Sequence, residues 1–276
     1  MKNTYLKVAI IVSAFFSLTM SSNVAMAENI TSLGAINDFA IIANTTITNT
    51  GPSSITGNVG LTPGTSITGF QFATLNGTKN INNASSVAAK NNTITIYNNI
   101  NEYQSSLTAP TLGGTTKTAG TYNSASGAFE ITGTLTLDGQ NNPNAIFVFK
   151  ADSTLVTSNY SKIVLINGAQ ACNIFWRVGS SATIGVNSIF KGNLIVLTST
   201  TVNTGANIEG RILVINGAVT LDNNSINKPS CSGNITIANE NTEHATPEIS
   251  SNTYANNYLL TRIRLLEIIN LLQLRK

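Results

Sequence analysis

Charged side chains are scarce in this sequence. Asp, Glu, Lys and Arg make up 10% of its 276 residues, whereas an ordinary soluble domain has about 25%, and the formal net charge is only +3. This composition excludes a highly charged disordered chain and offers no basic cluster that would bind nucleic acid. The only histidine, His244, lies in a polar stretch near the C-terminus, which argues against catalysis by histidine.

Motifs of catalytic and cofactor sites are also missing. The sequence contains no P-loop, no G-x-S-x-G motif and no Cys/His ligand set. An enzyme such as a polysaccharide lyase would need clustered carboxylates for calcium or a basic residue for proton abstraction. The aspartates between residues 30 and 231 are Asp38, Asp138, Asp152 and Asp222, and none of them has the spacing of a metal-ligand pair. We therefore predict a protein that is not an enzyme and needs no cofactor or metal.

Short uncharged polar residues take the place of charge. The chain holds 38 Asn, 37 Thr and 26 Ser, which is more than a third of its residues, so its surface must consist mostly of them. Hydrophobic residues make up 42% of the chain, which is enough to bury a sizeable core at this length.

The N-terminus has the pattern of a secretory signal peptide. Lys2 and Lys7 precede an apolar run at 8–18, and the sequence Ala-Met-Ala ends at Ala27. The run is too short to span a membrane, so residues 1–27 are predicted to be removed and the mature chain to be secreted or periplasmic. In an oxidising compartment Cys172 and Cys231, the only two cysteines, are expected to form one disulfide.

Composition divides the mature chain at Cys231. Residues 28–231 are rich in Thr, Asn and Gly and can build a core, whereas 232–257 are polar and 258–276 are apolar and basic. The last segment is compatible with an amphipathic helix at a membrane surface, or with an unstructured or self-associating extension. Three charged residues in its interior, Arg262, Arg264 and Glu267, argue against an integral membrane span. The role of residues 232–276 stays open.

A short motif recurs in the body of the chain. It has the form apolar-x-Gly-x-apolar and begins at Ile55, Ile131, Phe190 and Ile208, the last two copies 18 residues apart. Coils of this length hold three short strands and three corners, and stacked coils bury their inward Val, Ile and Leu. The repeats favour a β-solenoid; a β-sandwich, which also has short strands and Gly-rich turns, is the alternative.

One stretch without Gly or Pro interrupts the strands. From about residue 80 to 107, apolar residues recur at steps of three and four. This spacing predicts one long helix packed along the solenoid, with an apolar stripe formed by Ile81, Ala84, Val87, Ala88, Ile94, Tyr97 and Ile100.

Five segments of the body share an apolar residue between two small ones. Because successive side chains of a strand point to opposite faces, an inward middle residue sends both neighbours outward onto one face. The expected outward set has no charge and is rich in threonine: Thr46, Thr48, Thr154, Val156, Thr183, Gly185, Thr201, Asn203, Ala218 and Thr220.

A stiff array of hydroxyl and methyl groups suits an ordered, uncharged target. A dissolved small molecule would need a concave pocket with converging polar groups, which nothing in the sequence indicates. Crystalline water matches best, because hydroxyls can occupy lattice positions while methyls hold water between them. The alternative is that Thr and Asn are simply common on solenoid faces, where strand propensity and corner geometry favour them.

Several runs resemble the DUF3494-type family of microbial ice-binding (antifreeze) proteins. They include residues 33–41, 48–52, 55–65, 132–140, 146–149, 166–171, 175–180 and 216–222, and the similarity covers about 32–231. The resemblance implies a discontinuous right-handed three-faced β-helix with one long α-helix alongside, closing near its start. It also implies that the listed face binds ice and thereby inhibits ice growth and recrystallisation.

A secreted adhesin or structural solenoid is the alternative function. A Thr-rich face could bind sugar or a partner surface, and a carbohydrate site would often expose aromatics. Trp176, the only tryptophan, fits the core or an exposed position equally well. We expect a monomer whose partner is the surface of an ice crystal.

Overall fold

The computed structural model describes residues 33–230, which lie within one compact unit of the chain. The predicted signal peptide, residues 1–27, and the predicted extension, residues 232–276, lie outside the described residues, as does Cys231. Among residues 33–230 there is no helix long and apolar enough to cross a membrane.

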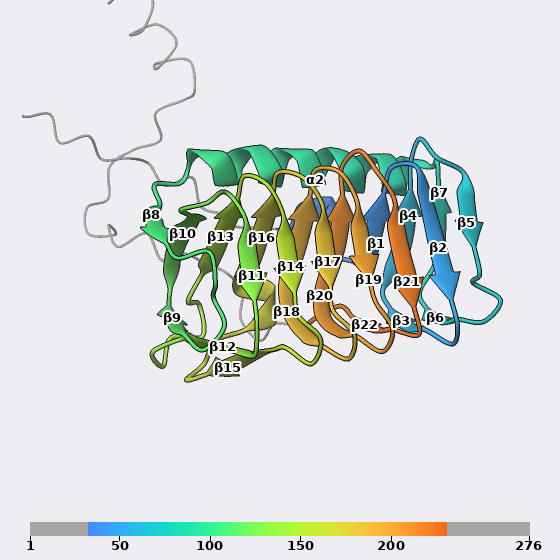
Figure 1. The fold of residues 1–276 in the computed structure, drawn as a ribbon. Coiled ribbons are helices and arrows are strands. Elements are labelled where there is room, and N and C mark those ends of the chain that lie inside the picture. Colours follow the sequence, from blue (N-terminus) through green and yellow to red (C-terminus); the bar gives the residue numbers. More distant parts are fainter. Residues whose placement is uncertain (1–32, 231–276) are drawn as a thin grey trace, which may run out of the picture. The chain divides into compact units, whose positions relative to one another are not determined.

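The fold is a three-faced β-helix in which the strands pair in parallel (Figure 1). A seven-stranded sheet forms one face, in the order β11 (Phe129–Ile131), β14 (Leu155–Thr157), β17 (Ala182–Ile184), β19 (Thr200–Val202), β21 (Val219–Asp222), β2 (Thr46–Thr50) and β5 (Ser66–Thr68). This right-handed β-helix is the predicted fold, and the sandwich alternative is wrong.

A fifteen-stranded sheet forms the other two faces. The face under the helix holds β7 (Lys79–Ile81), β4 (Asn58–Leu61), β1 (Phe39–Ala43), β16 (Ile174–Val178), β13 (Phe147–Ala151), β10 (Gly120–Ser124) and β8 (Ser106–Thr108). The lower face holds β6 (Thr74–Asn76), β3 (Ser54–Thr56), β22 (Ser225–Asn227), β15 (Lys162–Ile166), β12 (Thr134–Asp138) and β9 (Thr116–Thr118).

Two long strands, β18 (Ile189–Val196) and β20 (Asn207–Val214), turn the corner between these faces. Their glycines, Gly192 and Gly210, lie side by side at the bend. Gly192 has a φ of +114°, and a Cβ on Gly210 would lie 1.9 Å from the carbonyl oxygen of Gly192. The recurring glycine of the sequence motif is therefore required where two coils bend in contact.

The order of coils along the solenoid differs from their order in the sequence. The first coils include β1 to β7, after which the helix α2 (Ala84–Glu102) runs along the solenoid to its other end (Figure 1). From β8 onward the chain winds back coil by coil until β20, β21 and β22 pair with β1, β2 and β3. The seam thus joins the first and last coils, as the family resemblance implied.

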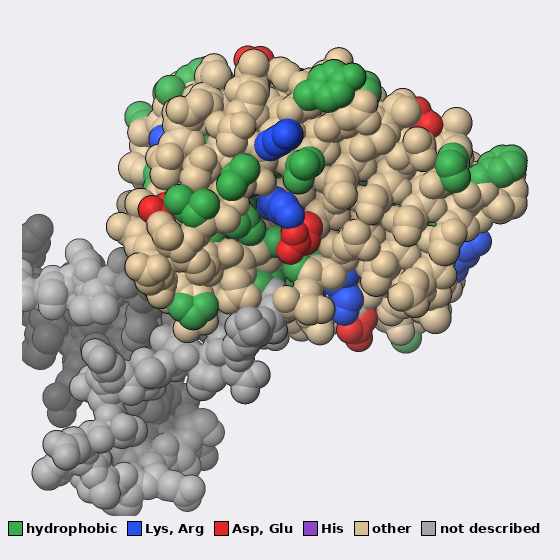
Figure 2. Space-filling model, turned by 90° about the horizontal axis from the view of Figure 1, so that it is seen from below, with side chains coloured by type: hydrophobic (Ala, Val, Ile, Leu, Met, Phe, Trp, Pro, Cys, Tyr) green, Lys and Arg blue, Asp and Glu red, His purple; other side chains and the backbone are tan. Residues whose placement is uncertain are grey.

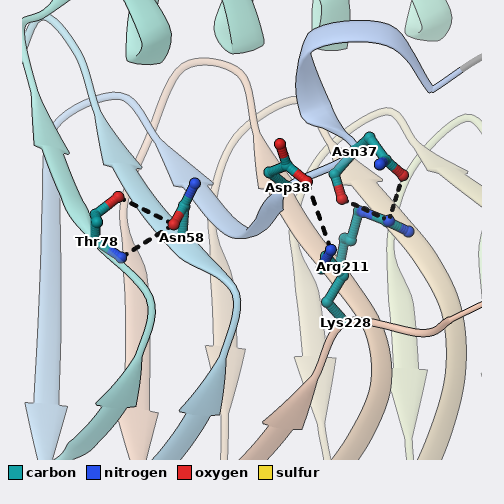
Figure 3. A network of polar contacts seen from close by, with 6 residues as sticks. All are labelled: Asn37, Asp38, Asn58, Thr78, Arg211 and Lys228. Carbon is teal, nitrogen blue, oxygen red and sulfur yellow. Dashed lines mark hydrogen bonds and ion pairs between the residues drawn. The ribbon is translucent and has the colours of Figure 1, made fainter.

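Buried polar groups tie this seam together. Arg211 on β20 is 1% exposed and donates from Nη1 to Asn193 Oδ1 at 2.9 Å. Its Nη2 donates to the carbonyl oxygen of Asn37 at 2.9 Å (Figure 3). Nearby, Lys228 Nζ lies 3.6 Å from an oxygen of the exposed carboxylate of Asp38. Arg211 therefore connects residues 174 positions apart in the sequence.

The core fills the space between the three faces with Ile, Val, Leu and Phe. Trp176 belongs to it: its side chain is 1% exposed, its ring stacks on Phe149 at 4.1 Å between centroids, and its indole N–H donates to the carbonyl oxygen of Lys191. Trp176 is thus a core residue and cannot serve as an exposed carbohydrate platform.

The predicted helix is present but shorter than residues 80–107. It begins after Asn83, whose side chain accepts from Ser86 N in a capping box, and it ends before Tyr103. Residues 79–81 and 106–108 are strands instead. The predicted apolar stripe is partly wrong, because Ala84, Val87 and Ala88 are exposed. The buried side of the helix is made up of Ser86, Ala89, Lys90, Thr93, Ile96, Tyr97 and Ile100.

The buried stripe has the same helical spacing but is turned from the expected one. Small residues such as Ser86 and Ala89 let the N-terminal half approach the sheet, where it packs with Phe39 and Ile42 of β1. Hydrophobic periodicity alone could not choose between two stripes of equal spacing.

Candidate functional site

Five threonines form one straight row across the seven-stranded sheet. Register places Thr183 beside Thr201, Thr201 beside Thr220, Thr220 beside Thr48, and Thr48 beside Thr68. The residues on either side of each threonine in β2, β17, β19 and β21 are buried, as strand alternation requires. The structure therefore places Thr48, Thr183, Thr201 and Thr220 on one outer face, the position that strand alternation predicted for them.

A second row of small residues runs beside the threonines. Thr46 lies opposite Ser66, and continuing the pairing by one residue brings Ala218 into this row. Backbone bonds from Thr200 N to Ala218 O, from Ala182 N to Ser199 O and from Leu155 N to Ser181 O continue the ladder. Thr46, Thr154 and Ala218 thus lie in this second row, as expected.

The sequence interpretation missed four residues of these rows: Ser66, Thr68, Ser181 and Ser199. The segment Ser66-Ile67-Thr68 follows the same small-apolar-small rule as the five chosen segments, so the rule itself could have found β5. The two serines lie two residues before segments that were chosen, and only the strand register shows that they belong to the second row.

Gly185 does not face outward, so that expectation is wrong. It is buried, it lies just after the end of β17, and a Cβ there would lie 2.5 Å from the carbonyl oxygen of Thr157. Asn203 is likewise beyond its strand: it is half-buried at the corner after β19, where its carbonyl oxygen accepts from Asn224 Nδ2 at 2.8 Å. Alternation holds only within a strand, and both residues lie where the chain already turns.

The face is interrupted at its β11 end. The threonine row continues through Val156 to Glu130, an exposed carboxylate that the sequence interpretation did not place on this face. Beside them is a hollow of about 370 Å³, lined by Pro110, Thr111, Ser126, Ala128, Phe129, Glu130, Thr154 and Val156. The all-threonine part of the row therefore runs from β17 to β5, while Val156 lies between it and Glu130, and Thr154 and Val156 both border the hollow.

The lower face of the solenoid has a different surface. It carries charged and hydrophobic side chains scattered among polar ones (Figure 2). Lys191 on β18 is paired with Glu209 on β20. Ile189 on β18 itself and Val164 and Ile166 on the neighbouring strand β15 are exposed. Such a surface cannot offer an uninterrupted neutral lattice, which the threonine rows do.

The described residues contain no cluster that points to metal chemistry. Between residues 33 and 230, no group of three or more His, Cys, Asp or Glu side chains could hold a metal ion. Cys172 is 3% exposed and is disulfide-bonded, while its predicted partner, Cys231, lies outside the described residues.

These features define a class of protein: a discontinuous β-helix that presents a sheet with an uncharged row of threonines. Residues 41–227 match the model of the ice-binding-like family, and the chain belongs to this family. An ice-binding protein of Nostoc sp. (strain HG1) is 43% identical over 219 residues, which cover 78% of this chain and 81% of the relative.

Solved structures of ice-binding proteins are also similar to this chain. The crystal structure of an ice-binding protein from the Antarctic ascomycete Antarctomyces psychrotrophicus is 38% identical and has a TM-score of 0.69, covering 72% of this chain and 98% of its own. An ice-binding protein from an Antarctic biological consortium is 44% identical with the same TM-score, covering 71% of this chain and 90% of its own.

Proposed function

We propose that this protein binds ice through the seven-stranded sheet and thereby inhibits ice growth and recrystallisation. The observation that carries the proposal is the row Thr183, Thr201, Thr220, Thr48 and Thr68, which spans five paired strands without a charge. Membership of the ice-binding-like family supports it. The second row, including Thr46 and Ala218, widens the same surface.

Regular spacing is what makes this surface suitable for ice. Strands in the sheet are about 4.8 Å apart, and neighbouring outward positions along one strand are about 6.7 Å apart. Threonine is stiff at χ1, so its hydroxyl and methyl groups keep this spacing with little loss of entropy on binding. Each contact with water is weak, so affinity comes from many contacts made in register.

The test is a bulky side chain at the centre of the row. We expect Thr201→Tyr to abolish most ice recrystallisation inhibition and thermal hysteresis, because one projecting ring keeps neighbouring threonines away from the crystal. The matched control is Thr134→Tyr, at an exposed position of β12 on the lower face, which should keep full activity.

Both variants should give the circular dichroism spectrum and melting temperature of the parent protein. Full activity in a correctly folded Thr201→Tyr variant would move the ice-binding surface to another face. If the parent protein left ice unaffected and were retained on a glycan column, the adhesin interpretation would replace the proposal.

We also propose that the mature protein works outside the cytoplasm as a monomer without a cofactor or enzymatic activity. The signal-peptide pattern of residues 1–27 and the low charge of the chain support export and an inert surface.

A further inference from the structure

The threonine row crosses the seam between the two ends of the β-helix. Thr220 and Thr48 pair directly, although one belongs to the last coil and the other to the first. Chain connectivity cannot fix their register, because more than a hundred residues lie between them. The register at this seam rests on contacts between the first and last coils, and these include contacts at the turns that lead into the two strands.

Three such turns are stacked at the edge of the face. Gly217 precedes β21, Asn44 and Thr45 precede β2, and Gly64 precedes β5. The backbone nitrogens of Asn44 and Thr45 both donate to the carbonyl oxygen of Gly217, at 3.0 and 3.1 Å, and Gly64 N donates to Asn44 O at 2.8 Å. Asn44 thus lies at the centre of the stack.

One side chain of α2 reaches into this stack. Lys90 is 8% exposed, and its Nζ donates to Asn44 Oδ1 at 2.5 Å and to the carbonyl oxygen of Thr62 at 3.5 Å. Asn44 Nδ2 in turn donates to the carbonyl oxygen of Asn216 at 3.1 Å. A chain of hydrogen bonds therefore runs from the helix to the turns before β5, β2 and β21.

Burying this ammonium group is costly. Desolvation lowers the pKa of Lys90, and among residues 33–230 Lys90 has no ion pair with a carboxylate. A cation held only by neutral acceptors adds little to the free energy of unfolding. The role of Lys90 is therefore to be sought in the arrangement of the turns that it contacts.

We propose that Lys90, acting through Asn44, is a positioning residue for the ice-binding face. It holds the three turns in one arrangement and thereby keeps Thr220, Thr48 and Thr68 in line with Thr183 and Thr201. This inference rests on the proposed function, since it concerns the register of the proposed binding surface.

The experiment compares two buried lysines at opposite ends of α2, Lys90 on the helix itself and Lys150, which contacts its C-terminal end. Lys150 on β13 is 9% exposed, and its Nζ donates to the carbonyl oxygens of Asn101 and Tyr103, both at 3.1 Å, at the far end of the helix. Burial lowers its pKa as well. Lys150→Met therefore removes a comparable buried cation without touching the turns before β21, β2 and β5.

We expect Lys90→Met and Lys150→Met both to change the melting temperature little, because each replaces a buried cation that adds little to stability. At equal concentrations of folded protein, Lys90→Met should lose ice recrystallisation inhibition several-fold, while Lys150→Met keeps the parent activity. Amide hydrogen exchange should rise at Thr48 and Thr220 in Lys90→Met only. Asn44→Ala should lose as much ice recrystallisation inhibition as Lys90→Met. The double variant Lys90→Met with Asn44→Ala should be no less active than either single variant, because the two residues act through one another.

Parent activity in folded Lys90→Met, or an equal loss in Lys150→Met, would overturn the inference. If Lys90→Met does not fold, Asn44→Ala decides by the same criterion. Failure of the proposed function is distinguishable, because Thr201 lies on β19, whose preceding turn Lys90 does not contact. An active Thr201→Tyr variant rejects the face itself, whereas an inactive one with active Lys90→Met rejects only the positioning role.

Discussion

At the scale of residues, the protein replaces charge by short polar side chains with two distinct uses. Threonines on β2, β5, β17, β19 and β21 point outward in a row, where stiffness matters. Asparagines serve inside the corners: Asn224 Nδ2, for example, donates to the carbonyl oxygen of Asn203. The few buried cations, Lys90, Lys150 and Arg211, are held by neutral acceptors and link segments distant in sequence.

Replacing Arg211 should show what such a link contributes. Arg211→Met leaves the buried Asn193 Oδ1 without this donor, which costs about 1–3 kcal/mol, and also removes the hydrogen bond to the carbonyl oxygen of the exposed Asn37. The control is Lys228→Met, whose partner Asp38 is exposed and whose loss should cost at most about 1 kcal/mol. Chemical denaturation measures the loss of stability in each variant. Equal losses in Arg211→Met and Lys228→Met would contradict the role of Arg211 as a buried link.

The pKa of Arg211 leads to a prediction about the pH dependence of stability. Burial lowers the pKa of Arg211 to about 10, well below its ordinary value, so the unfolded chain binds more protons than the folded one only from about pH 10 upward. Its contribution to the free energy of unfolding therefore rises with pH above about 10 and is constant below about 9. The cost of Arg211→Met should be the same throughout the neutral range, and denaturation curves at two neutral pH values test this.

At the scale of elements, α2 is held at both ends by different chemistry. Its N-terminus has the capping box of Asn83 and Ser86, and its C-terminal carbonyl groups accept hydrogen bonds from Lys150, which also complements the helix dipole. The strands between Gly-rich corners are only three to eight residues long, so each depends on its neighbours in the stack.

Removing the helix cap should therefore reduce stability without changing the threonine rows of the seven-stranded sheet. Asn83→Ala is expected to lower the free energy of unfolding by about 1 kcal/mol, because Ser86 N loses its acceptor. Asn91→Ala, at an exposed position inside the helix, should be neutral or slightly stabilising because alanine favours helix. An unchanged melting temperature for Asn83→Ala would show that tertiary packing alone fixes the helix start.

At the scale of the whole molecule, stability depends on closing the seam. The last coil pairs with the first through β20 with β1, β21 with β2 and β22 with β3. The predicted disulfide from Cys172 to Cys231 would fasten the end of this last coil to η2 (Ala171–Asn173), a short helix whose residue Cys172 accepts a hydrogen bond from Asn193.

Loss of that disulfide should loosen the closure. We expect Cys231→Ser to lower stability by up to about 4 kcal/mol through the larger entropy of the unfolded chain. Thermal melting of the variant, next to the parent protein with and without a reductant, measures the effect. A parent protein that reacts fully with a thiol reagent after unfolding without a reductant would show that the disulfide is not formed.

The sequence by itself determined the solenoid, the helix and most of the threonine row, because these follow from local alternation, Gly-rich corners and helical spacing, all of which act over a few residues. It did not determine that Gly185 turns inward, that Glu130 ends the row, or which side of the helix is buried. Those outcomes depend on where each strand ends and on which coils are neighbours. The pairing of Thr220 with Thr48 is an example. It depends on hydrogen bonds between the first and last coils, which no local sequence pattern predicts.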